Sequence, residues 1–294
     1  MSERTLIVIA GPTASGKTST SIQIAKALNT EIISADSRQF YKEMQIGTAA
    51  PTPQELLEVK HHFIHNISIK DEYDVATYEK EVLLCLEGLF LEHNTVIMTG
   101  GSGMFIDAVC NGIDTMPDID PSIRQRIAKM YEEQGIQALQ DAVMSLDPIY
   151  WETVDRQNPR RLQRALEICY QTGEPFSSFH THHKTERAFN IKRYALLWDR
   201  QTLYNRINQR VEQMLADGLV DEARSLYPYR QYNALNTVGY KELFSYFDGH
   251  CSLCDAVEQI KLNTRHYAKR QMTWFKKDSE YQWLSPAELT SIFL

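Results

Sequence analysis

Thr5-Leu-Ile-Val-Ile-Ala10 is followed at once by Gly11-Pro-Thr-Ala-Ser-Gly-Lys-Thr18. The first six residues are apolar and β-prone, and the next eight fit the P-loop pattern G-x-x-x-x-G-K-[ST]. Residues 17–28 then place Ile22, Ala25 and Leu28 on one helical face. A strand, a glycine-rich loop and a helix in this order predict a phosphate-binding site.

Each residue type in this loop has a physical use. Glycines let the backbone wrap an anion, while loop amides and the helix N-terminus direct positive charge at it. Lys17 adds a mobile cation, and the Thr18 hydroxyl is the expected ligand for Mg²⁺, the predicted cofactor. The pattern is shared with nucleotide-binding and ATP-binding proteins, and it does not identify ATP as the ligand. The predicted diphosphate-binding residues are Gly11, Pro12, Thr13, Ala14, Ser15, Gly16, Lys17 and Thr18.

Strand and helix patterns alternate through the first part of the chain. Strands are expected at 5–10, 31–36, 62–67 and 95–100, and helices at 17–28 and 75–92. This alternation predicts an α/β fold with a parallel sheet, whose ligands bind at the carboxyl ends of the strands. Asp36 and Gly100-Gly101-Ser102-Gly103 are expected at that edge.

The pattern changes near Pro117. Residues 117–190 read as helical, with breaks at Asp147-Pro148, Asn158-Pro159 and Gly173, before a further short strand at 194–198. We therefore expect a P-loop core formed by residues 1–116 and 191–294, and a mainly helical insertion formed by 117–190. A helix is expected at 201–215, on which Arg206 and Arg210 share a face.

Composition narrows the classes of function. The 294-residue chain has a net charge of −7, yet residues 156–210 carry +7 and residues 261–277 carry +6. Basic regions in an acidic protein suggest a polyanionic partner, although solvated helix faces would give the same pattern. Without a membrane-length apolar run, and with five cysteines that lack framework spacing, the chain is expected to be cytoplasmic, with no membrane partner. A monomer is expected as well. Cys251 and Cys254 form a lone C-x-x-C, and three histidines at 180, 182 and 183 are expected in a solvated loop.

A second acid for an ordinary P-loop kinase or NTPase is hard to find. Such enzymes usually hold Mg²⁺ with an Asp after an apolar strand. The candidate strand 95–100 ends in Thr99 and Gly100, so Asp36 is the one acid plainly expected near the loop.

Longer motifs favour a different chemistry. The P-loop together with Asp36-Ser-Arg-Gln-Phe-Tyr-Lys-Glu-Met-Gln-Ile-Gly-Thr-Ala-Ala-Pro51 closely resembles the tRNA dimethylallyltransferase (tRNA isopentenyltransferase) family of bacterial type. Further matches are Asp120–Arg124, Asn158–Glu167, Val238–Glu242 and Lys269–Trp274, so that the resemblance covers nearly the whole chain. It departs in Ser102, where Thr is frequent, and in Lys241, where Arg is frequent.

The resemblance implies transfer of a dimethylallyl group from dimethylallyl diphosphate to the exocyclic N6 of the adenine 3′-adjacent to the anticodon in tRNA. Asp36 would be the general base, with Thr13 and Arg210 as further catalytic residues. The anticodon stem-loop would be contacted partly by the insertion. The implied tRNA-binding residues are Asp36, Ser37, Arg38, Gln39, Ser102, Arg124, Arg160, Arg161, Leu162, Gln163, Arg164, Val238, Gly239, Tyr240, Lys241, Lys269, Arg270, Gln271, Thr273, Trp274 and Lys276.

Three alternatives stay open on sequence alone. A small-molecule kinase would share the P-loop and use ATP. An adenylate isopentenyltransferase would share the chemistry but act on AMP, without needing the basic insertion. A non-enzymatic nucleotide switch would bind GTP or ATP together with RNA, although no guanine-reading N-K-x-D motif is present.

Overall fold

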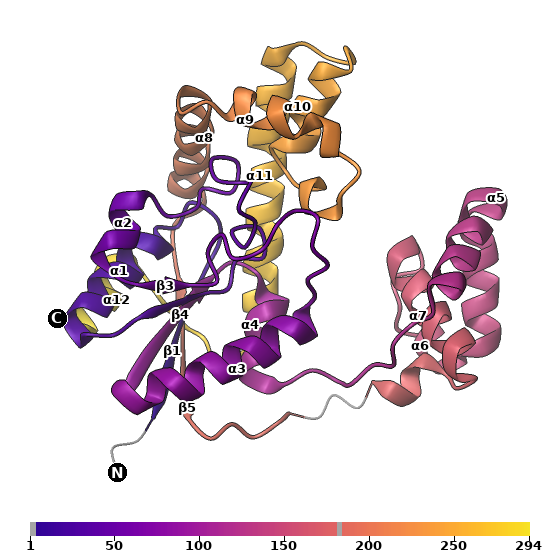
Figure 1. Cartoon of the computed structure of the whole chain (residues 1–294), viewed down its shortest axis with the longest axis horizontal. Helices are drawn as coiled ribbons and strands as arrows, with labels where there is room; N and C mark the ends of the chain where they lie inside the picture. Colours follow the sequence, from indigo (N-terminus) through magenta and orange to yellow (C-terminus); the bar gives the residue numbers. More distant parts are fainter. Residues whose placement is uncertain (1–3, 181–183) are drawn as a thin grey trace. The chain divides into compact units, whose positions relative to one another are not determined.

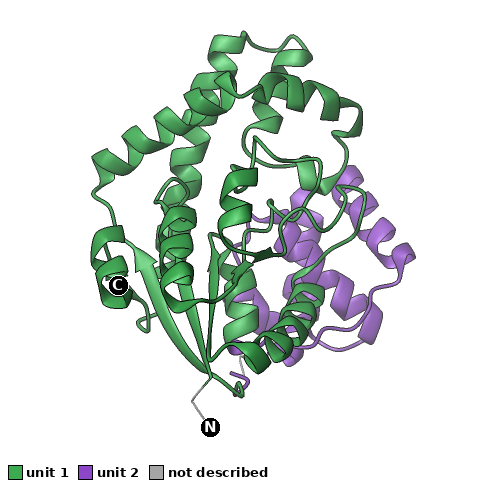
Figure 2. Ribbon diagram, turned by 60° about the vertical axis from the view of Figure 1, so that its left-hand side comes forward, with its two compact units in different colours: residues 1–110, 187–294 green, residues 111–186 purple. Residues whose placement is uncertain are grey.

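The computed structural model describes residues 4–180 and 184–294, which divide into two compact units (Figure 2). Unit 1 comprises residues 1–110 and 187–294, and unit 2 comprises residues 111–186. The insertion therefore begins at 111 rather than 117 and ends at 186 rather than 190. At this boundary Thr185 N donates a backbone hydrogen bond to Asn111 O (2.7 Å), which joins the two segments that enter and leave unit 2.

Unit 1 is built on one sheet of six parallel strands in the order β3-β2-β4-β1-β5-β6, which confirms the predicted α/β class (Figure 1). The P-loop strand β1 lies between β4 and β5, so its carboxyl end opens at the middle of the sheet edge. The strands are β1 (Thr5–Ala10), β2 (Ile32–Ser34), β3 (His61–His62), β4 (Thr95–Gly100), β5 (Asn190–Leu196) and β6 (Gln282–Leu284).

Some predicted boundaries hold and others are wrong. The ranges 5–10, 17–28, 75–92 and 95–100 are confirmed to the residue. β3 occupies 61–62 rather than 62–67, because Phe63 and His65 have positive φ values (61° and 50°) and leave the extended conformation. β5 begins at 190 rather than 194, because its ladder to β1 already starts at Asn190.

Helices cover both faces of the sheet. One face packs against α3 (Val75–Glu92) and α4 (Gly103–Asn111), where Tyr78, Val82 and Leu86 meet β1 and β4 residues such as Val8. The other face packs against α1 (Lys17–Leu28) and α12 (Pro286–Phe293) through Ile24 and similar side chains. Apolar burial on both faces explains why the strands are continuously hydrophobic.

The rest of unit 1 forms a second hydrophobic cluster beside the carboxyl edge of the sheet. Helices α8, α9, α10 and α11 bury Val211, Leu219, Leu243 and Ile260 together with Met44 from the segment after β2. Asp199 caps α8, as expected, by accepting a hydrogen bond from Thr202 N (2.9 Å). The helices are α2 (Pro53–Glu58), α8 (Arg200–Ala216), α9 (Leu219–Leu226), α10 (Tyr240–Phe247) and α11 (Leu253–Phe275).

Unit 2 is helical, as predicted. Its core joins α5 and α7 through Ile127, Leu139 and Leu166. Asp147 and Asn158 cap the helices that follow them, and Gly173 ends α7 with a φ of 77°. Its helices are α5 (Pro121–Leu146), α6 (Pro148–Trp151) and α7 (Pro159–Thr172). His182 and His183 of the predicted histidine loop lie outside the described residues.

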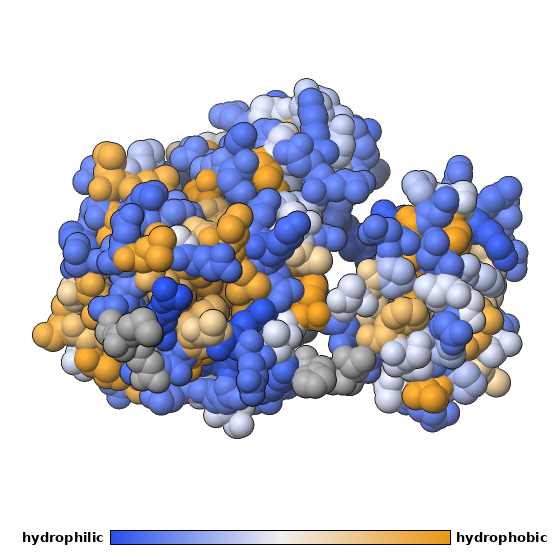
Figure 3. Space-filling view, turned by 60° about the horizontal axis from the view of Figure 1, so that its bottom comes forward, coloured by the Kyte–Doolittle hydropathy of each residue, from blue (hydrophilic) through white to orange (hydrophobic). Residues whose placement is uncertain are grey.

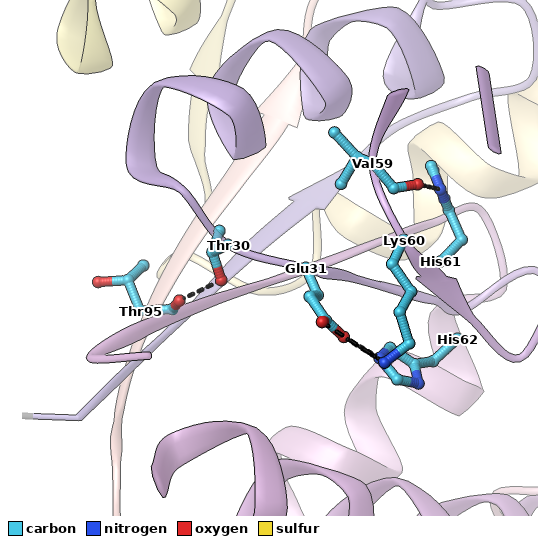
Figure 4. A network of polar contacts seen from close by, with 7 residues as sticks. All are labelled: Thr30, Glu31, Val59, Lys60, His61, His62 and Thr95. Atoms are coloured by element: carbon cyan, nitrogen blue, oxygen red, sulfur yellow. Dashed lines mark hydrogen bonds and ion pairs between the residues drawn. The ribbon is translucent and has the colours of Figure 1, made fainter. Parts of the chain in front are cut away.

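A polar network ties the strands together at the opposite edge of the sheet from the P-loop (Figure 4). The Glu31 carboxylate contacts His62 Nε2 at 2.5 Å and Lys60 Nζ at 3.2 Å. Partial burial would raise the Glu31 pKa, but hydrogen bonds from His62 and Lys60 outweigh it and lower this pKa. The Thr30 hydroxyl donates to the Thr95 carbonyl (2.5 Å), so that β2, β3 and β4 begin in a fixed register.

The surface shown in Figure 3 mixes hydrophilic side chains with separate apolar ones. Among residues 4–180 and 184–294, no helix is both long enough and apolar enough to cross a membrane. All five cysteines lie in these ranges and are free thiols, including Cys251 and Cys254.

Candidate active site

The P-loop, residues Gly11–Thr18, joins β1 to α1 as the sequence predicts. Gly11 and Gly16 have φ values of 150° and 92°, which L side chains rarely adopt. Lys17 turns back over the loop, and its Nζ donates to the carbonyls of Gly11 (3.0 Å) and Pro12 (2.9 Å). The ammonium is thus held at the mouth of the loop, where an anion would bind.

Two of the loop amides are already used within the protein. Thr13 N donates to Gln271 Oε1 (2.8 Å), and Ser15 N donates to Pro12 O (3.3 Å). Of the loop amides expected to direct positive charge at an anion, those of Thr13 and Ser15 therefore have acceptors within the protein. Their hydrogen bonds shape the loop instead.

The outer side of the loop is held by α8 and the residue two positions before it. Arg206 Nε donates to Ala14 O (2.7 Å), and Trp198 Nε1 donates to Ser15 O (2.8 Å). The Arg206 guanidinium also lies 4.7 Å from the centre of the Trp198 ring, a cation–π geometry. Two carbonyls of the loop are thereby engaged by donors from outside the loop.

A pocket of about 520 Å³ lies within unit 1 at the carboxyl edge of the sheet, and we call it the central pocket. Thr13, Asp36 and Arg210, the three predicted catalytic residues, all line it. Apolar side chains of Val211, Met214, Leu219, Val238 and Ile260 also line it, and we call them the apolar wall. Further lining residues are Ser37, Arg38, Gly47, Thr48, Ala49, Asn236, Thr237, Gly239, Lys241, Glu242, Asn263, Thr264, Tyr267 and Arg270.

The charges of Lys17, Asp36 and Arg210 influence one another. Burial lowers the Lys17 pKa to about 8, with Asp36 opposing this shift and Arg210 reinforcing it. Burial and the neighbouring Arg206 also lower the Arg210 pKa. Arg210 Nη1 reaches Thr13 Oγ1 at 3.4 Å. Two desolvated cations near one carboxylate make a site that gains from an added anion.

Asp36 is positioned by the chain that follows it. Its Oδ1 accepts a hydrogen bond from Arg38 N (3.2 Å). The next residue, Ser37, donates from N to Ser102 Oγ (2.9 Å), and the Ser102 hydroxyl donates to Ser37 Oγ (3.0 Å). Thus Ser102, in the loop after β4, fixes the backbone beside Asp36.

The segment 45–49 forms one side of the central pocket and is anchored by α9. The Glu222 carboxylate accepts hydrogen bonds from the amides of Gln45, Ile46 and Gly47, and from the Tyr240 hydroxyl (2.6 Å). Gly47 packs so closely on Tyr240 that an added Cβ would lie 2.6 Å from its ring.

Most of the predicted tRNA-binding residues of unit 1 fall into three groups. Asp36, Ser37, Arg38, Val238, Gly239, Lys241 and Arg270 line the central pocket. Lys269, Thr273, Trp274 and Lys276 are exposed at the end of α11. Gln39 is half-buried and donates to the carbonyls of Thr48 and Ala49, so it supports the pocket wall.

For three buried side chains the predicted contact with RNA is replaced by an internal role. Tyr240 and Leu162 are fully buried, and Gln271 is 5% exposed. Tyr240 bonds Glu222, Leu162 belongs to the core of unit 2, and Gln271 joins two loops of unit 1. The sequence placed them within the motifs that carry the family resemblance but could not show which way their side chains point.

Unit 2 carries the remaining predicted RNA contacts. Arg124, Arg160 and Arg161 are exposed, and Gln163 is half-buried. Arg164 pairs with Glu167 on the same helix (3.4 Å). Arg160 and Arg161 lie in the first turn of α7, where the helix dipole disfavours cations. Two arginines at that position therefore do not stabilise the helix, which favours a role in binding.

The predicted magnesium site does not rest on a cluster of acids. Within the described part of the chain, no group of three or more His, Cys, Asp or Glu could hold a metal ion. Thr18, which the sequence predicts as the Mg²⁺ ligand, lies in the first turn of α1. This ion is commonly held by few protein ligands together with phosphate oxygens and water.

Sequence reasoning missed several contributors to the site. Arg206 was predicted to share a helical face with Arg210, and Tyr267 lies within the basic stretch 261–277, but neither was assigned to the site. Burial raises the Tyr267 pKa well above its usual value, so its hydroxyl stays protonated in the pocket. Glu222 carried no sequence signal, because its role depends on the packing of α9 against the segment 45–49.

Known proteins with similar sequences include tRNA dimethylallyltransferases. Residues 39–278 match the family model described as IPP transferase. A tRNA dimethylallyltransferase of Christiangramia forsetii is 54% identical over 95% of this chain and 92% of its own length. A tRNA dimethylallyltransferase 1 of Bacteroides thetaiotaomicron is 50% identical over 98% of this chain and 94% of its own.

Solved structures resemble the whole chain. A tRNA isopentenylpyrophosphate transferase from Bacillus halodurans has a TM-score of 0.73 and 34% identity, covering 99% of this chain and 95% of its own. A eukaryotic dimethylallyltransferase, described as acting on tRNA, has a TM-score of 0.80 and 27% identity, covering 96% of this chain and 74% of its own.

Proposed function

The chain belongs to the IPP transferase family, and from that premise we propose that it transfers a dimethylallyl group from dimethylallyl diphosphate to N6 of the adenine 3′-adjacent to the anticodon in tRNA. One observation carries this proposal. Thr13 of the P-loop, the Asp36 carboxylate and the apolar wall all line one cavity of about 520 Å³.

The polar and the apolar lining of the pocket suit the two ends of the donor. The P-loop, Lys17 and Arg210 offer cationic groups to the diphosphate. Beside them, Val211, Met214 and Ile260 offer an apolar surface to a branched five-carbon chain. A kinase that binds ATP would need polar groups that contact the purine and the ribose. The apolar wall instead favours the five-carbon chain of dimethylallyl diphosphate.

The proposed transfer exchanges one bond of the allylic carbon for another. The carbon–oxygen bond to the diphosphate breaks, and a bond forms between the allylic carbon and the adenine N6. Asp36 takes the proton that N6 loses. Negative charge that develops on the leaving diphosphate is stabilised by Lys17 and Arg210, with the Thr13 hydroxyl beside them. Mg²⁺, held by Thr18 and the diphosphate oxygens, would supply further positive charge.

The acceptor is proposed to bind through the basic surfaces. Arg124, Arg160 and Arg161 on unit 2, and Lys269 and Lys276 on unit 1, are exposed and can contact phosphates. An adenine must leave its stack to reach Asp36 in the pocket, and unstacked bases of RNA loops are the usual targets of such recognition. We place the enzyme in the cytoplasm as a monomer, in keeping with its free thiols.

The test is transfer of radiolabel from dimethylallyl diphosphate to unmodified tRNA, with Mg²⁺ and without ATP. Label in the RNA is expected. A strict requirement for ATP would instead support a kinase. Preferential labelling of AMP over tRNA would support an adenylate isopentenyltransferase.

A further inference from the structure

Gln271 is a buried amide that connects three parts of unit 1. It lies on α11, is 5% exposed, and accepts a hydrogen bond from Thr13 N (2.8 Å) through Oε1. Its Nε2 donates to the carbonyl of Gly101 (2.9 Å), in the loop after β4. One side chain therefore links α11, the P-loop and the loop that holds Ser37 through Ser102.

Both ends of this side chain are needed at once. An acceptor must face the Thr13 amide and a donor must face the Gly101 carbonyl, and glutamine offers both where methionine or glutamate does not. The approach is close, because a Cβ added to Gly101 would lie 2.2 Å from Gln271 Nε2. Such a fit leaves the amide little freedom to shift.

The consequence for the reaction runs through Thr13. Its amide is held by Gln271, so its side chain is directed into the central pocket, where Oγ1 meets Arg210 Nη1 at 3.4 Å. α11 also places Tyr267 and Arg270 in the same pocket. Hence the helix that lines the pocket also sets the conformation of the loop expected to hold the donor.

We propose that Gln271 is a positioning residue for dimethylallyl transfer, acting through Thr13 and not by contact with RNA. This inference rests on the proposed function. The inference explains why Gln271 is buried among backbone groups, although it lies in the middle of the basic motif Lys269–Trp274. Misplacement of reacting groups by about 1 Å can cost about 100-fold in rate.

The first experiment replaces the amide while conserving its volume. Gln271→Met is expected to lower the single-turnover transfer rate by about 10- to 100-fold at saturating tRNA, with tRNA affinity within about 2-fold of wild type. Asn208→Ala is the matched control, since it removes the hydrogen bond from Arg265 Nη1 on α11 (3.1 Å) without touching the P-loop. It should transfer at the normal rate. A normal rate in Gln271→Met, or a loss confined to tRNA affinity, would overturn the inference.

A double-mutant cycle separates positioning from general destabilisation. Thr13→Ala removes the hydroxyl but keeps the amide that Gln271 holds. If Gln271 acts through Thr13, adding Gln271→Met to Thr13→Ala should lower the rate by less than about 3-fold. Multiplicative effects would contradict the proposal. Should Gln271→Met lose its cooperative melting transition, Gln271→Leu, which offers neither donor nor acceptor, enters the same cycle with the same outcomes. Failure of wild-type transfer would instead count against the proposed function itself.

Discussion

Arg206 donates from Nε to the carbonyl of Ala14 in the P-loop at 2.7 Å, while Arg210, one turn further along α8, faces the central pocket. The two arginines share a helical face but have different partners. Arg206 neutralises a loop carbonyl and stacks on Trp198, whereas Arg210 is left to meet a ligand beside Thr13.

The first prediction separates these two arginines. Arg210→Ala should weaken binding of dimethylallyl diphosphate by about 10- to 100-fold, the usual value of a hydrogen bond to a charged group, with an unchanged melting temperature. Arg206→Ala should weaken donor binding and also lower the melting temperature by several degrees (about 2–4 °C per kcal/mol). Calorimetric titration and thermal melting measure both. Equal melting losses in the two variants would contradict this division of roles.

The second prediction concerns the Lys17 proton. Its pKa of about 8 in the free protein means that the ammonium is partly deprotonated at pH 8. A bound diphosphate favours the charged form and raises this pKa, so binding at pH 8 should take up about half a proton, and less as the pH falls below 7. Titrations in buffers of different ionisation enthalpy measure the uptake.

Lys17→Arg supplies the control, because arginine stays charged at this pH and should bind the donor without proton uptake. A binding enthalpy in the wild type that does not depend on the buffer would rule out a lowered Lys17 pKa.

The third prediction concerns the general base. Asp36→Asn keeps an oxygen acceptor for Arg38 N but cannot take a proton. The variant should fold and bind tRNA normally, yet transfer about 10²–10⁴-fold more slowly in a single turnover. Near-normal transfer by a folded Asp36→Asn protein would remove Asp36 from the role of base.

The fourth prediction concerns the exposed cations. Neutralising Arg160 and Arg161 to Gln should weaken tRNA binding and flatten the slope of log affinity against log salt, by about one unit for each phosphate that is no longer neutralised. The Lys269 and Lys276 pair should behave likewise, with donor affinity unchanged. Filter binding over a salt series measures the slope.

Lys26 and Lys80, which are exposed outside the central pocket, provide the matched neutralised pair. Their replacement should leave the slope unaltered. If neutralising the control pair flattened the salt slope as much as neutralising Arg160 and Arg161, net charge alone, and not position, would govern tRNA binding.

The fifth prediction compares two glycines. Gly47→Ala forces its Cβ to within 2.6 Å of the Tyr240 ring and should cost about 1–3 kcal/mol of unfolding free energy through overpacking, with reduced donor use because Gly47 lines the pocket. Gly88→Ala on α3 meets no atom within 4 Å and should stabilise the protein by up to about 1 kcal/mol. Urea denaturation distinguishes them, and stabilisation by Gly47→Ala would show that Tyr240 moves aside freely.

Much of unit 1 could be predicted because its signals are local. β1, the P-loop and α1 follow from apolar periodicity and glycine spacing, and the structure gives 5–10 and 17–28 as expected. Strands with two or three paired residues were harder to predict. β3 ends at His62 because positive φ at Phe63 turns the chain, and apolar pattern alone does not report φ.

By itself, the sequence determined the α/β class, the phosphate loop, and the residues Thr13, Asp36 and Arg210 that meet in one pocket. Only the tertiary structure decided how neighbouring side chains divide their tasks. Gln271 turns inward while Lys269 stays exposed, and Glu222 captures three amides of a segment far away in the chain. Spacing along a helix fixes which residues share a face, but burial and hydrogen-bond partners come from the elements packed against that face.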